Sequence, residues 1–168
     1  EASDFVENTT SMLLFATVVL TIIFFFGMPY IIQVLAPGFT DNKEAYELAV
    51  HFGKIIFPYI IFISLAAHFA SINNVHERFA AGAFAPAILN ISFILSLFFL
   101  TPFVTTAGHA LSYGVLIGGI LQFLYLYRAV LNFYQPRIRI PVLNEKLKKF
   151  FKLFLPGVVG SGVIQLNI

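Results

Sequence analysis

The sequence predicts an all-α, polytopic transmembrane helix bundle, and three observations lead to this fold class. Hydrophobic residues make up 59% of the 168 residues and charged residues only 11%, whereas a soluble domain carries about 25% charged residues. The charged residues are gathered between long uncharged runs. Each complete run can hold a helix of about 20 residues, the length that crosses a bilayer. Cysteine is absent, which excludes disulfides and thiolate metal sites.

The gaps between charged residues define the expected spans. The first uncharged run lies between Glu7 and Asp41 and fits one tilted helix. The second follows Lys54. The third, 79–127, is too long for one span, and a sequence rich in Thr, Pro and Gly near 101–109 divides it in two. The predicted spans are approximately 11–36, 55–76, 81–100, 111–131 and 153–168, the last of which looks truncated, so we expect the chain to be a fragment.

Residues 57–90 are expected to form a helical hairpin around which the other segments are arranged. Its two apolar halves are joined by a polar turn at 73–78. Upstream, Asp41 and Glu44 have the spacing of a capping box, which predicts a helix that starts after Asp41. Proline cannot donate a backbone hydrogen bond, so helices are expected to bend at these sites. The four helix-bend candidates are Pro29, Pro58, Pro86 and Pro156.

The distribution of Lys and Arg predicts the orientation in the membrane. With four complete spans, the turn 73–78 and the segment 128–152 lie on one side, and they hold eight of the 10 Lys and Arg residues. This excess places them in the cytoplasm. Residues 144–152 are expected to form an interfacial helix whose cations contact anionic lipid or recruit a lipid-phosphate substrate. The headgroup candidates are Arg137, Arg139, Lys146, Lys149 and Lys152.

The residues indicate neither an enzyme nor a metal site. No two histidines have the i, i+4 spacing of a helical metal site, the acids form no paired-carboxylate motif, and no cofactor or nucleic acid is predicted as a ligand. His68 lies within a span, where an ionisable residue suggests function, with neutral packing as the alternative. Small residues allow close helix packing or a sliding surface between helices. The packing candidates are Gly82, Gly114 and Gly118.

Several short motifs follow one another along the chain: Ala36-Pro37-Gly38-Phe39, Phe57-Pro58-Tyr59, Ile63-Ser64-Leu65, Asn74-Val75-His76-Glu77-Arg78-Phe79, Ala83-Phe84-Ala85-Pro86, Leu89-Asn90, and Leu155-Pro156 followed by Gly160, Gln165 and Asn167. In order and spacing they resemble the MurJ (MviN) family of lipid II flippases. Many members carry proline at the position of Gly82, so the match departs from the family there. The acidic Glu77 beside Arg78 is a second departure, and it weighs against a purely cationic role for the turn.

This resemblance implies a fourteen-helix transporter of the MOP superfamily, of which the chain covers about the third helix to the start of the seventh, in the N-terminal lobe. It implies transport of lipid II to the outer leaflet of the bacterial inner membrane by alternating access. The bilayer and the remaining helices are the other implied partners. The family's substrate-binding arginines lie on helices that this chain lacks. Alternatives are another MOP exporter, of polysaccharide-lipid or drugs, or a non-transporting membrane scaffold. Arg78 is the only Lys or Arg between Lys54 and Arg128, which makes it the first candidate for a functional residue. The substrate or gating candidates are Arg78, Glu77, Asn74 and His68.

Overall fold

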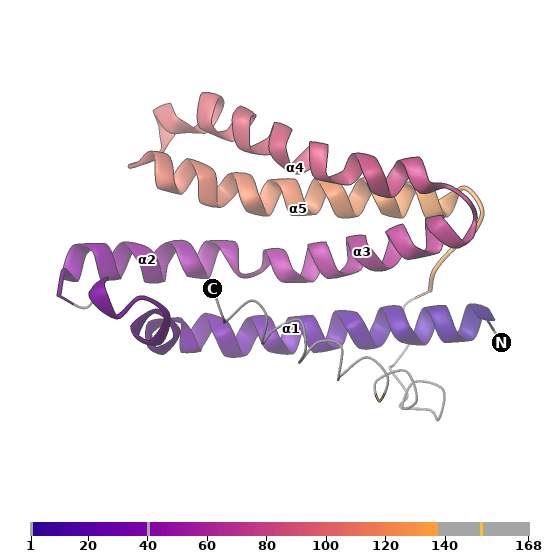
Figure 1. Ribbon diagram of the computed structural model, residues 1–168, viewed down its shortest axis with the longest axis horizontal. Coiled ribbons are helices and arrows are strands. Elements are labelled where there is room, and N and C mark those ends of the chain that lie inside the picture. The colour runs from indigo at the N-terminus through magenta and orange to yellow at the C-terminus, as the bar shows by residue number, and fades with distance from the viewer. Residues whose placement is uncertain (1, 40, 138–151, 153–168) are drawn as a thin grey trace. The chain divides into compact units, whose positions relative to one another are not determined.

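The computed structural model describes residues 2–39, 41–137 and 152, and within these residues the regular structure is entirely helical. The chain divides into two compact units, residues 1–12 with 136–168, and residues 13–135. The packing described below belongs to the second unit. Because all the regular structure of the described residues is helical, the predicted all-α class is confirmed. The helices are α1 (Ala2–Leu35), α2 (Lys43–Ile56), α3 (Tyr59–Val75), α4 (Phe79–Leu100) and α5 (Ala107–Leu131), with short 3-10 turns at Pro37–Phe39 and Thr101–Phe103 (Figure 1).

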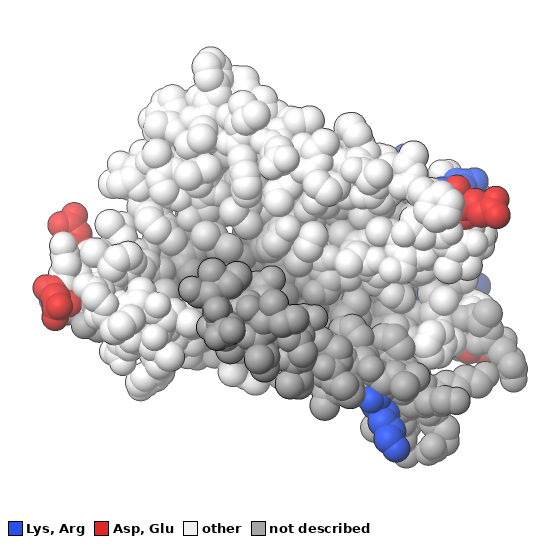
Figure 2. All heavy atoms as spheres, viewed as in Figure 1, with Lys and Arg blue, Asp and Glu red and all other residues white. Residues whose placement is uncertain are grey.

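Four helical stretches in the described residues are long and apolar enough to cross a membrane. Large apolar side chains lie on their outer surfaces; Phe26 and Phe98, for example, are each 75% exposed. In water such surfaces would be costly, whereas in a bilayer lipid covers them. On the face that Figure 2 shows, red atoms lie at both ends of the helices, and the part of the surface between them that is drawn in white carries no Lys, Arg, Asp or Glu. The stretches are Ser3–Leu35, Lys43–Val75, Phe79–Phe103 and Ala107–Leu131.

Helix α1 begins well before the apolar part of its predicted span, because its polar first turns are also helical. The hydroxyl groups of Thr9, Thr10 and Ser11 each donate to the carbonyl oxygen four residues earlier, at 2.7–2.8 Å. Such bonds satisfy the hydroxyls inside the helix itself. Pro29 lies inside α1, and Pro86 lies inside α4.

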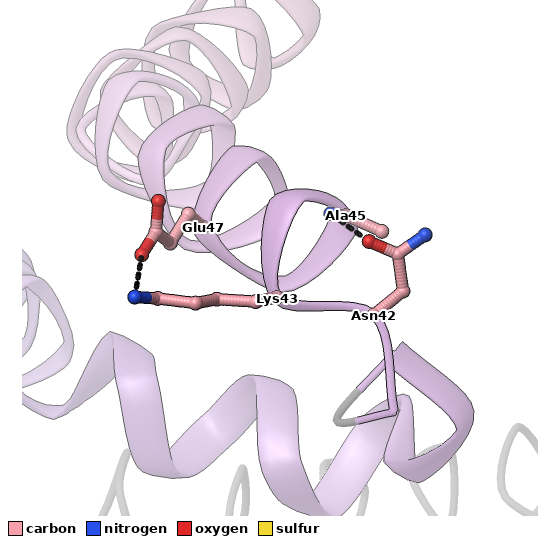
Figure 3. Close-up of polar contacts among 4 residues, drawn as sticks. All are labelled: Asn42, Lys43, Ala45 and Glu47. Atoms are coloured by element: carbon pink, nitrogen blue, oxygen red, sulfur yellow. Dashed lines mark hydrogen bonds and ion pairs between the residues drawn. The ribbon is translucent and has the colours of Figure 1, made fainter.

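The start of α2 differs from the prediction by one residue. Asn42, rather than Asp41, is the N-cap: its backbone is extended (φ −121°, ψ 101°) and its side-chain oxygen accepts a hydrogen bond from the Ala45 N–H at 3.1 Å (Figure 3). Asn and Asp cap helices about equally well. The backbone path at this loop therefore decided between the two neighbours, and the predicted cap at Asp41 was wrong.

Helices α2 and α3 run end to end with a break at Phe57 and Pro58 (Figure 1). The Phe57 N–H still donates to the Gly53 carbonyl at 2.9 Å, but Pro58 has no N–H with which to continue the α-helical ladder. Pro58 therefore marks the boundary between two helices. The ring of Phe57 stacks on Phe24 of α1, with ring centroids 4.4 Å apart. Pro156 lies outside the described residues.

Helix α5 is the centre of this unit, because α2, α3 and α4 all pack against it. Leu126 and Val130 of α5 are almost fully buried. The expectation that the 57–90 hairpin is central was wrong, since α3 and α4 each contact α5 more extensively than they contact each other. Glycines explain the close approach: a Cβ on Gly114 would lie 2.9 Å from the Ser96 Cβ, and a Cβ on Gly119 would collide with the Tyr59 ring.

Candidate functional site

The turn between α3 and α4 is held by backbone hydrogen bonds. The Asn73 carbonyl accepts from the N–H groups of His76 at 3.0 Å and Arg78 at 2.9 Å. Glu77 adopts φ 60°, the left-handed region that non-glycine residues rarely occupy. This conformation reverses the chain within three residues, so that α4 can start at Phe79. Glu77 and Arg78 are both exposed at the tip.

Asn73 connects this turn to α5. Its side chain is fully buried, and its Nδ2 donates to the Phe69 carbonyl at 2.9 Å and to the Leu126 carbonyl of α5 at 3.5 Å. Its Oδ1 has no hydrogen-bond partner among the described residues. The sequence candidate was the neighbouring Asn74, which is exposed. Two adjacent asparagines at a helix end gave no signal of which one faces inward.

The ring of Phe133, just beyond the end of α5, contacts both basic side chains of the turn. The ring centroid of Phe133 lies 4.2 Å from that of His76, and the guanidinium carbon of Arg78 lies 4.8 Å from the Phe133 centroid. We call His76, Arg78 and Phe133 the turn cluster. A cation over an exposed ring gains about 0.5–1 kcal/mol. The cluster favours this position of the Arg78 guanidinium and connects the turn to the chain that follows α5.

Two other sequence candidates, His68 and Asn74, do not contact the turn cluster. His68 is half-buried in α3, with its ring 5.7 Å from that of Phe69, and it lies about 12 Å along the helix axis from His76. The Asn74 Oδ1 lies beside Gly82 of α4, 3.8 Å from where a Cβ would be. The structure therefore brings Arg78 and His76 together and leaves His68 apart.

A second buried amide lies between α4 and α5. Gln122 is 3% exposed, and its Nε2 donates to the carbonyl of Ala85 at 2.8 Å, directly before Pro86. Its Oε1 has no hydrogen-bond partner among the described residues. A polar side chain in an otherwise apolar run was the available signal, and Gln122 was not among the predicted site residues. A bond of this kind holds two helices together where lipid offers no alternative partner.

Two histidines far apart in sequence meet at the opposite end of α5. The rings of His51 on α2 and His109 on α5 have centroids 5.2 Å apart, and Phe52 contacts His109 edge-on at 4.9 Å. The His109 Nδ1 lies 2.9 Å from the Thr106 hydroxyl. In the part of the chain that the structure describes, no third His or acidic side chain joins them in a metal-binding group.

The predicted headgroup residues lie largely beyond the described part of the chain. Arg137 and Lys152 are described, and both are exposed. The expected interfacial helix at 144–152 falls outside the described residues except for Lys152. Three other headgroup candidates also lie outside the described residues: Arg139, Lys146 and Lys149.

Comparison with known proteins decides the family. The family model described as lipid II flippase MurJ matches residues 1–168. The chain belongs to the MurJ family. A probable lipid II flippase MurJ of Rhizobium tropici is 32% identical, and one of Rhizobium meliloti is 34% identical, each over 99% of this chain. The lipid II flippase MurJ of Burkholderia cenocepacia is 35% identical over 71% of the chain.

The chain spans about a third of the length of the MurJ relatives that it matches, 32% for both Rhizobium proteins. Membership of the MurJ family and the four apolar helical stretches together make it a multi-pass membrane protein. The resemblance inferred from the motifs around the turn is thus confirmed by a match along the whole chain.

Proposed function

We propose that the protein to which this chain belongs moves lipid II from the cytoplasmic to the outer leaflet of the bacterial inner membrane by alternating access. The observation that carries this proposal is the match of the MurJ family model to residues 1–168. The activity is transport, with no covalent step. It belongs to the longer protein, because the chain spans about a third of its relatives. Neither of the alternative functions, another MOP exporter or a scaffold, gains support from these matches.

The proposed topology places the turn 73–78 and the segment 128–152 in the cytoplasm. It rests on the eight Lys and Arg residues in these two stretches and on the positive-inside rule. Helix α3 then descends to the cytoplasm and α4 returns. The test is direct because this chain contains no cysteine that would react in the background. In a cysteine-free version of the full protein, Asn74→Cys should be shielded from an impermeant thiol reagent in intact cells, whereas Asn42→Cys should react. The reverse pattern would overturn this topology.

Within this topology, Arg78 is the proposed contact for the phosphate of the lipid-linked substrate or for gating at the cytoplasmic side. Its guanidinium lies over Phe133 and remains exposed at the tip of the turn. Glu77 and Asn74 are proposed to shape the same turn. His68, which lies deeper in α3, is proposed as a separate candidate along the substrate path.

The lipid contacts and helix motions are further parts of the proposal. We propose that the basic side chains after α5 contact lipid headgroups, and that the prolines of the spans allow the helices to bend during alternating access. Support for the bends is strongest at Pro58, where the helix is already broken between α2 and α3. The proposed headgroup contacts are Arg137, Arg139, Lys146, Lys149 and Lys152.

Complementation tests both the function and the role of Arg78. The full-length gene should restore growth and rod shape to a bacterium depleted of its own lipid II flippase. Failure despite normal membrane expression would count against the proposed function. In a complementing gene, Arg78→Ala should reduce rescue. The matched control is Arg128→Ala, an exposed arginine at the end of α5; equal loss in both variants would refute a specific role for Arg78.

A further inference from the structure

A pocket of about 250 Å³ lies between α1 and α2. A hydrogen bond holds its walls together: the Tyr46 hydroxyl donates to the carbonyl of Pro29 in α1 at 3.0 Å. A second contact, from Gln33 Nε2 to the Tyr46 hydroxyl at 3.3 Å, reinforces it. The α2 residues of the pocket recur at helical spacing and so share one face. The lining residues are Pro29, Tyr46, Glu47, Val50, His51 and Lys54.

The charges along this pocket have a fixed order. Glu47 lies near the polar start of α2, close to the loop that ends at Asn42. Lys54 lies seven residues later, about 10.5 Å further along the helix axis, directly before the uncharged run 55–76. In a bilayer, the carboxylate is therefore on the water side and the ammonium on the hydrocarbon side.

Neither charged group has a strong ionic partner among the described residues. The Lys54 ammonium lies 5.2 Å over the ring of Phe25, and among the described residues it makes no ion pair. Glu47 lies 3.9 Å from Lys43 in an exposed i, i+4 pair, with side chains 65% and 90% exposed (Figure 3). Such surface pairs are weak and easily exchanged for another partner.

We propose that this pocket binds the headgroup of a zwitterionic aminophospholipid, phosphatidylethanolamine. In this headgroup the phosphate is joined to the glycerol and the ammonium is at the outer end, so in a bilayer the negative charge lies deeper. Lys54 then meets the phosphate, and Glu47 accepts hydrogen bonds from the ammonium. Such charge-assisted hydrogen bonds are the stronger kind. Phosphatidylglycerol has no ammonium for Glu47, and the choline of phosphatidylcholine has no N–H to donate to it.

The test uses the purified full-length protein, stripped of lipid in mild detergent. Native mass spectrometry then measures retention of added phosphatidylethanolamine, phosphatidylcholine and phosphatidylglycerol. Phosphatidylethanolamine should be retained best. Lys54→Gln and Glu47→Gln should each weaken its binding about fivefold, as expected for one partly exposed charge-assisted bond. Glu44→Gln removes an exposed carboxylate of the same helix that lies outside the pocket, and it should leave binding within about twofold.

The two pocket variants test the phosphate contact and the ammonium contact of the headgroup separately. Lys54→Gln should weaken all three lipids, whereas Glu47→Gln should remove only the preference for phosphatidylethanolamine. Lys54→Arg keeps the charge and should retain binding, which distinguishes loss of the site from loss of the fold. Equal retention of the three lipids, unchanged binding in both pocket variants, or an internal crosslink showing another segment of the protein against Lys54 would each overturn the proposal. Transport is not the readout, so the result stands apart from the proposed flippase activity.

Discussion

Replacing Gly114 of α5 with alanine should force α4 away from α5. The new Cβ would lie 2.9 Å from both the Cβ and the Oγ of Ser96, whereas carbon atoms pack best about 3.5–4.0 Å apart. Because the Ser96 Cβ is attached to its own backbone, α4 itself must retreat by about 0.6 Å. Overpacking of this kind costs about 1–3 kcal/mol, and the better helix propensity of alanine offsets about 0.5–1 kcal/mol.

We therefore expect Gly114→Ala to destabilise the full-length protein by about 1 kcal/mol, the difference between the middle values of these two ranges. The assay is thermal melting in detergent, followed by size-exclusion chromatography of a fluorescent fusion. The matched control is Gly27→Ala in α1, where the new Cβ meets only the Ile31 side chain at 3.9 Å. Gly27→Ala gains the same helix propensity without the clash, so the melting temperature of this variant should be unchanged or higher.

A second substitution tests the contact between Gly114 and Ser96 itself. Ser96→Gly removes the opposing Cβ, so it should cost less in the Gly114→Ala background than in the wild type, with a coupling of about 1 kcal/mol. If Gly114→Ala melts at or above Gly27→Ala, or if the two substitutions are additive, then the close approach of α4 and α5 does not depend on the missing side chain.

Three further predictions concern the turn between α3 and α4, all measured by the same melting assay. Glu77→Gly should be neutral or stabilising because glycine adopts φ 60° freely, whereas Glu77→Val should cost about 1–2 kcal/mol; equal effects would contradict the left-handed turn. Asn73→Asp should destabilise by about 2–3 kcal/mol and more than Asn73→Leu, because it puts a carboxylate in a fully buried site; the opposite order would show that water reaches this position. A double-mutant cycle of Phe133→Leu and Arg78→Gln should give a coupling of about 0.5–1 kcal/mol, and no coupling would mean that the ring does not hold the guanidinium.

The helical segments were accessible from sequence because the signals for them are local. Long uncharged runs, divided by charged turns and by the Thr-, Pro- and Gly-rich sequence near 101–109, located four apolar helical stretches. Helix α4 (Phe79–Leu100) begins two residues before the expected span. The turn at 73–78 was recognisable from its polar residues alone. Local signals still left neighbouring residues undecided, since Asn42 rather than Asp41 caps α2. Both side chains can cap, and only the path of the backbone distinguishes them.

The candidate site was harder to predict because it depends on contacts between distant segments. Arg78 was chosen because it is an isolated cation in a long apolar stretch, and the structure added the Phe133 ring beneath it. Phe133 is one of 21 phenylalanines, so composition could not single it out. Nothing in the periodicity of α5 showed that Gln122 would face the carbonyl before Pro86.

The sequence by itself determined that this chain is a set of membrane-crossing helices, how its positive charge is divided, and to which family its motifs belong. These properties depend on the hydrophobicity of each segment and on the hydrogen bonds within each helix. Only the tertiary structure decided that α5 is the centre, that Phe133 meets Arg78, and that Glu47 and Lys54 line one pocket beside Pro29. In helices that are apolar all round, the side that turns inward is set by how closely neighbouring helices can approach, and that is a property of pairs of helices.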